Sequence, residues 1–273
     1  MTLSRAGKVA VAAAKEAGAL LRSSFGHIAR KDVSYKSDNG PVSLVDFASN
    51  DIIIRHISRA FPDHDILSEE GPGSDRANIR HGKKTWIVDP IDGTTNFISG
   101  VPLFAVAIAL VERGVIKLGV IYDPIHDEMF VAEQGRGAWL NGKRIRVSGR
   151  DVVRGALLYA GRGYREKDLE KHGKIIYELE RRTSYFRRLG TAAIMLAYVA
   201  AGRTEAVILT GNKPWDTVAG ILLVREAGGR VSDYCGCRWT MKSEDVVATN
   251  ANIHKHLVDI TKKIKAANCT QKM

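Results

Sequence analysis

The stretch WIVDPIDGTTNF, residues 86–97, sets two carboxylates on either side of a proline at the end of an apolar run. The apolar run predicts a buried strand. Asp89 precedes Pro90, which favours an extended backbone, and the Pro90 ring fixes a turn that brings Asp92 back beside Asp89. Two carboxylates this close repel each other unless a cation lies between them. The stretch therefore predicts a metal site, because carboxylate oxygens suit a hard cation such as Mg²⁺.

Three further acids stand where a predicted strand ends or a predicted helix begins. Glu69 and Glu70 follow a short apolar run in ILSEEG, and Asp216 begins the apolar helix predicted for residues 215–227. Taken singly, the two glutamates fit a solvated turn and Asp216 fits a carboxylate that complements a helix dipole. Taken together with Asp89, these acids favour one shared site.

The second half of the opening stretch suits a phosphate. Gly93 and Thr94 stand at the expected start of a short helix, where glycine permits close backbone approach and free N–H groups attract an anion. The Thr94 hydroxyl is suited to orienting a water molecule. Asp46, at the start of the helix predicted for residues 46–61, is its candidate partner, since a hydroxyl held by a carboxylate can position a nucleophilic water.

Hydropathy gives no membrane span and no signal peptide. The longest apolar run, FAVAIALV at residues 104–111, is far shorter than the roughly 20 residues that a span needs. The N-terminal stretch is interrupted by Lys8, Lys15 and Glu16, so it predicts an amphipathic helix. We expect no membrane partner.

The cysteines and the charge point to a cytoplasmic protein with an anionic partner. Cys235, Cys237 and Cys269 make no disulfide framework, which predicts free thiols in a reducing cytoplasm. The net charge of +11 favours an anion. Its local cluster at residues 180–190 comes without a helix-turn-helix, zinc-finger or aromatic RNA-binding signature, so a small anionic molecule is expected and nucleic acid is not.

The two halves of the chain differ in the order of their predicted helices and strands. Helices predicted at residues 3–25 and 46–61 are followed by short strands up to residue 145, which indicates an antiparallel meander. Beyond it, helices are predicted at 166–182, 191–201, 215–227 and 252–267, with strands at 184–188, 205–209, 230–232 and 245–248. This alternation is typical of α/β structure, whereas the first half is typical of α+β. We expect two tightly packed lobes, residues 1–145 with most metal ligands and residues 146–273 with Asp216 and the substrate side.

Three motifs, DPIDGTTNF, SEEG and PWDTVAG…EAGG, resemble the inositol monophosphatase family in their order and spacing. The similarity extends from the helix carrying Asp46, through YDPIHDEMFVAEQGRGAWLNG, to RRLGTAA. The resemblance implies a layered α-β-α-β-α sandwich and a homodimer. It also implies a phosphomonoesterase that binds two to three Mg²⁺ ions, whose activated water attacks phosphorus in line with the ester oxygen of a small phosphorylated substrate.

The resemblance assigns roles by matching position. It implies a first metal at Glu69, Asp89 and the carbonyl of Ile91, a second at Asp89, Asp92 and Asp216, and a third, weaker ion near Glu69. Asp46 and Thr94 match the pair that activates water, and the amides of Gly93 and Thr94 match the phosphate cradle. With these roles carried over from the resemblance, the expected substrate-binding set comprises Ile91, Asp92, Gly93, Thr94, Arg187, Gly190, Thr191, Ala192 and Asp216.

The sequence departs from the family where inositol is recognised. Inositol-selective members carry a glutamate seven residues before the last aspartate, and Leu209 stands there. Inositol 1-phosphate is the leading substrate; fructose 1,6-bisphosphate and a broad set of sugar or nucleotide phosphates are the alternatives. Arg162, Arg187 and Arg188 are candidates for a second phosphate. Thr95 argues against the nucleotide-clearing members. A regulatory factor associated with RNA or ribosomes that keeps the fold is the alternative from another class.

Overall fold

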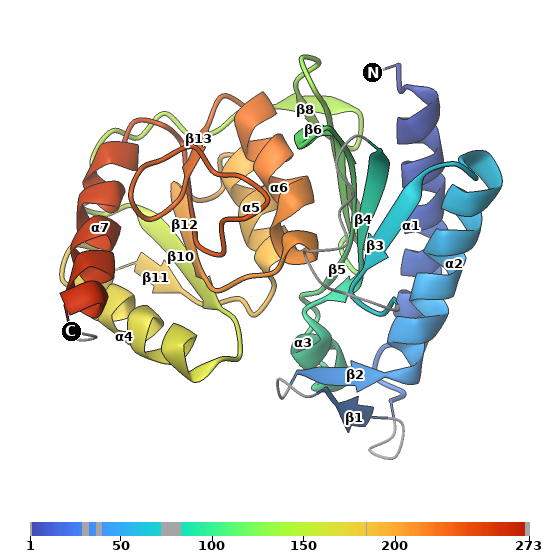
Figure 1. Ribbon diagram of the computed structural model, residues 1–273, viewed down its shortest axis with the longest axis horizontal. Helices are drawn as coiled ribbons and strands as arrows, with labels where there is room; N and C mark the ends of the chain where they lie inside the picture. The colour runs from blue at the N-terminus through green and yellow to red at the C-terminus, as the bar shows by residue number, and fades with distance from the viewer. Residues whose placement is uncertain (1, 29–32, 37–39, 72–82, 184, 271–273) are drawn as a thin grey trace.

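The computed structural model describes residues 2–28, 33–36, 40–71, 83–183 and 185–270, with only the backbone of residues 265–270. Five layers follow one another across the molecule, as Figure 1 shows, and the expected sandwich is confirmed. From the N-terminal side they are α1 (Arg5–Ser24) with α2 (Leu44–Ala60), a seven-stranded sheet, α5 (Ala192–Ala200) with α6 (Pro214–Glu226), a five-stranded sheet, and α4 (Glu166–Glu180) with α7 (His254–Thr270). No helix of the described ranges is both long and apolar enough to cross a membrane.

The seven-stranded sheet holds its strands in chain order. They are β3 (Asp65–Ser68), β4 (Lys84–Asp92), β5 (Ala105–Glu112), β6 (Val115–Asp123), β7 (Glu128–Glu133), β8 (Ala138–Leu140) and β9 (Lys143–Ile145). Asn141 and Gly142, both with positive φ, close the predicted two-residue hairpin between β8 and β9. The expectation of a wholly antiparallel meander is wrong at β3, which pairs parallel with β4. A strand of four residues with only two apolar side chains carries no pattern that gives its direction, so this pairing left no signal in the sequence.

The five-stranded sheet has the order β11-β10-β12-β14-β13. Its strands are β10 (Leu157–Arg162), β11 (Tyr185–Arg187), β12 (Ala206–Thr210), β13 (Arg230–Ser232) and β14 (Val246–Thr249). β10 was not predicted, and neither was the ribbon of β1 (Val33–Tyr35) and β2 (Pro41–Ser43). Residue 184 of the predicted strand 184–188 and the side chain of Cys269 lie outside the described residues. β10 runs parallel to both β11 and β12, so these three strands end at one edge of the sheet.

Helices α5 and α6 fill the space between the two sheets. Eight of the nine residues of α5 and ten of the thirteen of α6 are buried, as is typical of a helix that is apolar on every side. Two glycines allow the close packing: a Cβ on Gly119 of β6 would lie 2.5 Å from the carbonyl oxygen of Ala219, and one on Gly220 would lie 2.4 Å from Cβ of Leu196. One apolar cluster therefore joins both halves of the chain. The division at residue 145 falls between β9 and β10 and stays a prediction.

Candidate metal and phosphate site

Three carboxylates from three elements meet at one end of the layers. One oxygen each of Glu69, Asp89 and Asp216 lies within 4.8 Å of the other two. The parallel pairing of β3 with β4 brings Glu69 beside Asp89, because the Glu69 N–H donates to the carbonyl of Val88 at 3.1 Å. Asp216 arrives from the first turn of α6, where its Oδ2 accepts the Lys213 N–H at 2.7 Å. The predicted cluster of acids is therefore assembled from both halves of the chain.

The proline of the opening stretch shapes the end of β4. The pairing with β5 shifts its register between Asp89 and Asp92, an irregularity that re-aims the side chains around Pro90. Asp89 Oδ1 accepts the Ile91 N–H at 3.1 Å, which fixes the turn. Asp89 and Asp92 are both buried and lie within each other's electrostatic field. The pairing is thus irregular at Pro90, as the proline predicted, while the placing of Asp92 beside Asp89 stays a prediction.

Burial and repulsion between neighbouring carboxylates raise the pKa of Asp89 and of Asp216. Burial raises the pKa of Asp89 well above its usual value, and the charges of Glu69, Asp92 and Asp216 raise it further. Burial, with the charges of Glu69 and Asp92, raises the pKa of Asp216 to about 8. Such a set binds a proton or a cation at neutral pH. Clustered carboxylate oxygens are the ligands that Mg²⁺ takes, so the donor set fits this ion.

Asp92 also ties the end of β4 to the beginning of α5. Its carboxylate accepts hydrogen bonds from the Thr191 hydroxyl, from Ala192 N–H at 3.2 Å and from Ala193 N–H at 2.9 Å. Burial raises the pKa of Asp92 to about 6, although these hydrogen bonds oppose the rise. Thr191 and Ala192 of the predicted substrate set therefore lie beside Asp92. They meet it as hydrogen-bond donors, a role that sequence did not indicate.

Gly190, which precedes Thr191, allows the segment before α5 to pack against α3 (Thr94–Ile98). Its φ of 76° lies in the left-handed region, and a Cβ there would lie 2.9 Å from Oδ1 of Asn96. The Asn96 side chain donates to the carbonyls of Leu103 and Leu189, both at 2.7 Å. Gly93, with a φ of 95°, precedes α3, and a Cβ there would lie 3.1 Å from the Leu103 carbonyl oxygen. Only glycine suits these two positions.

The expected pair of hydroxyl and carboxylate is present. The Thr94 hydroxyl lies 3.1 Å from Asp46 Oδ1 and 2.9 Å from the Ile91 carbonyl oxygen, and it can donate its hydrogen bond to either of them. The other oxygen of Asp46 accepts both the N–H and the hydroxyl of Ser43, at 2.8 and 2.6 Å. Burial raises the pKa of Asp46. The Thr94 oxygen is thereby held at a fixed place beside the acids.

Two residues at the site were missed by sequence reasoning. The Lys36 ammonium lies 2.7 Å from Glu69 and also contacts Glu70, and these contacts outweigh burial and raise the pKa of Lys36. Burial raises the pKa of Glu70 to about 7. The Tyr164 hydroxyl lies 3.3 Å from the Thr95 hydroxyl across the two halves of the chain. A single lysine or tyrosine in a loop has no pattern that could have pointed to it.

Some residues of interest lie apart from the acids. Arg187 donates to the carbonyl of its neighbour Phe186, and within the described residues no ion pair joins it to the acidic cluster. Arg162 and Arg188 lie near the buried His172 of α4, whose pKa burial and these two charges lower to about 4. Leu209 is fully buried in the apolar cluster that also contains Met195. It therefore offers no surface to a ligand.

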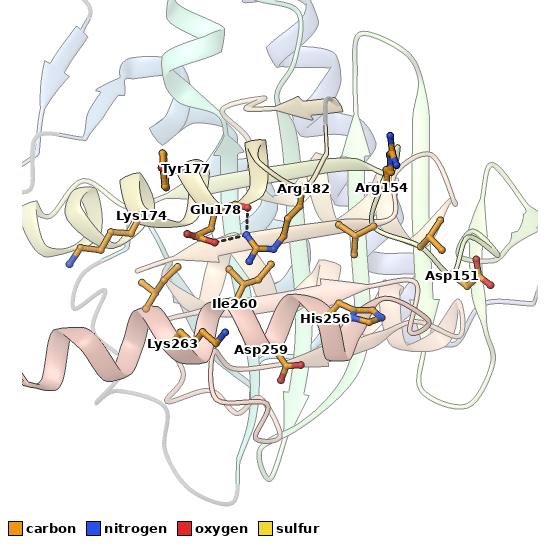
Figure 2. A pocket seen from close by; sticks show the side chains of 13 residues that line it. Asp151, Arg154, Lys174, Tyr177, Glu178, Arg182, His256, Asp259, Ile260 and Lys263 are labelled. Atoms are coloured by element: carbon orange, nitrogen blue, oxygen red, sulfur yellow. Dashed lines mark hydrogen bonds and ion pairs between the residues drawn. The ribbon is translucent and has the colours of Figure 1, made fainter.

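A cavity of about 870 Å³ lies elsewhere. It opens between α4 and α7, next to residues 151–154, and Figure 2 shows Glu178 and Arg182 paired within it. None of the acids described above lines it. The convergence of carboxylates, and not the size of a cavity, identifies the chemical site.

Comparisons with known proteins agree with this geometry. The family model described as "Inositol monophosphatase family" matches residues 3–266. An inositol-1-monophosphatase of Mesorhizobium japonicum is 43% identical over 263 residues, covering 93% of this chain and 95% of the relative. The "Nus factor SuhB" of Pseudomonas aeruginosa is 41% identical over 253 residues, covering 92% of this chain and 93% of the relative. The crystal structure of the extragenic suppressor protein suhB of Bartonella henselae has a TM-score of 0.87 and 38% identity, covering 95% of this chain and 99% of that one.

Proposed function

Because the chain belongs to the inositol monophosphatase family and is therefore a phosphoric monoester hydrolase, we propose that it hydrolyses a small polyol or sugar phosphate with Mg²⁺ as cofactor. Inositol 1-phosphate is the leading substrate. The observation that carries the proposal is the meeting of Glu69, Asp89 and Asp216 within 4.8 Å. A homodimer in a reducing cytoplasm is part of the proposal; Cys235 and Cys237 are free thiols.

The residues that would hold two to three ions are Glu69, Asp89, Asp92, Asp216 and the carbonyl of Ile91. Mg²⁺ bound there supplies charge that offsets the phosphoryl oxygens and lowers the pKa of water. The protein's own contribution begins with placing these oxygens before the ion arrives. The hydrogen bonds of Asp92 to α5 and of Asp216 to Lys213 hold two of the carboxylates in position.

Thr94 and Asp46 orient the attacking water in this proposal. When the Thr94 hydroxyl donates to Asp46 Oδ1, its oxygen has lone pairs free to accept a hydrogen bond from the attacking water, whose proton can pass to the hydroxyl as the hydroxyl proton passes to Asp46. The N–H groups of Gly93 and Thr94 would bind a phosphate oxygen. The segment Gly190–Ala192 then lies on the substrate side, since it is fixed against both α3 and Asp92.

The proposed specificity is broad. A side chain that accepts hydrogen bonds from ring hydroxyls discriminates sharply, whereas an apolar residue discriminates weakly. Leu209 has neither an acceptor nor exposed surface. We therefore place sugar phosphates, including fructose 1,6-bisphosphate, alongside inositol 1-phosphate as substrates.

Phosphate release tests the proposal. The protein is assayed with inositol 1-phosphate, fructose 1,6-bisphosphate and NADP, in Mg²⁺ and in EDTA. Release that requires Mg²⁺, disappears in Asp89→Asn and survives in Asp259→Asn supports it; Asp259 is an exposed acid of α7 and serves as the matched control. Release that persists in EDTA, or an Asp89→Asn variant as active as wild type, would refute it.

A second function is favoured by the relatives and by the charge. Relatives at 39–41% identity are named "Nus factor SuhB", and the chain carries a net charge of +11. We propose RNA association as this second candidate. It predicts salt-sensitive RNA binding that survives Asp92→Asn, since phosphate contacts and not the acids would provide the affinity. Absence of binding at low salt excludes it.

A further inference from the structure

A cavity of about 620 Å³ lies at the C-terminal end of α6, bordered by β13 and by residues 236–240. Arg225, Arg230 and Arg238 line it, and we call it the arginine pocket. Arg225 follows Asp216 by nine residues, so the pocket lies roughly 14 Å along the helix axis from the acidic cluster. The two sites therefore do not share side chains.

Among the described residues, the three arginines have no acid paired with them. No ion pair joins Arg225, Arg230 or Arg238 to a carboxylate in the part of the chain that the structure describes. Glu226 is the sole acid among the lining residues. Its two oxygens accept the N–H groups of Gly135 and Gly137, each at 2.8 Å. The cavity in Figure 2 differs, because there Arg182 pairs with Glu178 and two further acids line the walls.

The arginines are not needed to cap α6. The last carbonyls of the helix already accept backbone N–H groups: Leu223 from Ala227 at 2.9 Å, Val224 from Gly229 at 2.8 Å and Arg225 from Gly228 at 3.1 Å. In the described ranges, Arg225 makes one side-chain hydrogen bond, a long one of 3.4 Å to the Trp239 carbonyl. Most of its N–H groups are left for a ligand. Burial and the nearby charge of Arg238 lower the pKa of Arg225, so the repulsion is not relieved within the protein.

A buried donor is unpaired in the same wall. Trp239 is 3% exposed, lines the pocket, and its indole Nε1–H has no partner among the described residues. A buried N–H without an acceptor is costly, so it indicates a missing acceptor at this place. Three guanidinium groups and one indole N–H offer donors only. Their complement is a compact ion with several oxygens and at least one negative charge.

We propose that the arginine pocket binds a phosphate-type oxyanion, independently of Mg²⁺ and of the catalytic acids. Guanidinium groups bind tetrahedral oxyanions through paired, charge-assisted hydrogen bonds. A single carboxylate has too few oxygens to accept hydrogen bonds from all three guanidinium groups of the pocket. The anion is either free phosphate or the phosphoryl group of a larger molecule.

Indole resonances give a site-specific test. ¹⁵N-labelled protein in EDTA is titrated with inorganic phosphate, with sodium chloride at equal ionic strength as reference, and the Trp239 Nε1–H signal is assigned by its loss in Trp239→Phe. We expect a saturable shift of this signal and an unmoved Trp86 signal, because Trp86 lies in the other sheet. A shift equal to that in chloride would overturn the proposal.

Variants separate this pocket from the active site. Arg230→Gln with Arg238→Gln removes two exposed side chains and should weaken phosphate binding by roughly tenfold or more. The control is the double variant Arg22→Gln with Arg59→Gln, which loses the same charge at exposed sites on α1 and α2 and should leave phosphate binding unchanged. Asp216→Asn should also leave phosphate binding unchanged. Equal weakening in both double variants contradicts the proposal. A titration with glycerol 2-phosphate identifies the source of the anion. If glycerol 2-phosphate binds as well as inorganic phosphate does, the pocket binds the phosphoryl group of a larger molecule; if only inorganic phosphate binds, the ligand is the free ion.

Discussion

The carboxylate of Asp92 accepts a hydrogen bond from the hydroxyl of Thr191, a residue 99 positions further along the chain. The same carboxylate accepts two N–H groups at the beginning of α5. A single side chain at the end of β4 thus fixes a candidate metal ligand and the substrate-side segment at once. The site therefore depends on contacts between the two halves of the chain as well as on contacts within the first half.

Asp92→Asn should lower turnover by orders of magnitude and also lower stability. An amide cannot accept all three hydrogen bonds at the α5 end, and leaving a buried donor unpaired costs about 1–3 kcal/mol. Steady-state kinetics and thermal melts of the same preparations measure both effects. Asp259→Asn is the control. Turnover close to wild type would remove Asp92 from the mechanism.

Thr94→Ala should lower kcat by about 10²–10⁴-fold, the usual loss for one member of a water-activating pair. KM should change less, because the backbone N–H that is proposed to bind phosphate remains. Thr95→Ala, one position along, is the matched control and should keep kcat. If Thr94→Ala raises KM alone, then Thr94 binds phosphate and does not orient water.

Tyr164→Ala should raise KM for bulky substrates more than for small ones. The phenol meets Thr95 across the two halves, and partial burial together with the charges of Glu69, Asp216 and Asp92 raises its pKa, so it lies within the electrostatic field of the acids. Tyr164→Phe keeps the ring and loses the hydroxyl, so it separates packing from hydrogen bonding. Comparing KM for inositol 1-phosphate and glycerol 2-phosphate measures the effect. Equal KM values in wild type and both variants would show that Tyr164 does not meet the substrate.

Stabilisation by Mg²⁺ should grow with pH. In the metal-free protein the pKa of Asp216 is about 8, whereas an unfolded Asp titrates near 4. Between these values the folded chain keeps a proton that the unfolded chain has released, so the free energy of unfolding falls as pH rises. A cation bound at Asp216 removes this loss of stability at high pH.

Thermal melts with Mg²⁺ and with EDTA test the direction of this pH dependence. The rise in Tm on adding Mg²⁺ should be several degrees larger near pH 8 than near pH 5.5, since about 1 kcal/mol corresponds to roughly 2–4 °C at this chain length. Asp216→Asn should flatten the dependence. A Mg²⁺ effect that is constant with pH would contradict the raised pKa.

Sequence predicted what was local and missed what depended on distant neighbours. Asp89, Pro90 and Asp92 predicted a turn with two converging acids because the proline restricts the backbone there. The parallel placement of β3, the strand β10 and the role of Lys36 depend on tertiary pairing, which leaves no periodicity in one chain. Leu209 was recognised as a departure, but its complete burial could be learned only from the packing of β12 against α5.

The close packing of α6, made possible by Gly119 and Gly220, has a consequence for dissecting the molecule. Asp216 lies in the first turn of that helix, whereas Asp89 lies in strand β4 of the seven-stranded sheet and Glu69 directly follows strand β3 of the same sheet. A chain cut between β9 and β10 would give two fragments, each with an incomplete set of carboxylates and a large uncovered apolar face. Each fragment should be inactive and prone to aggregate, and activity should return only when both are refolded together.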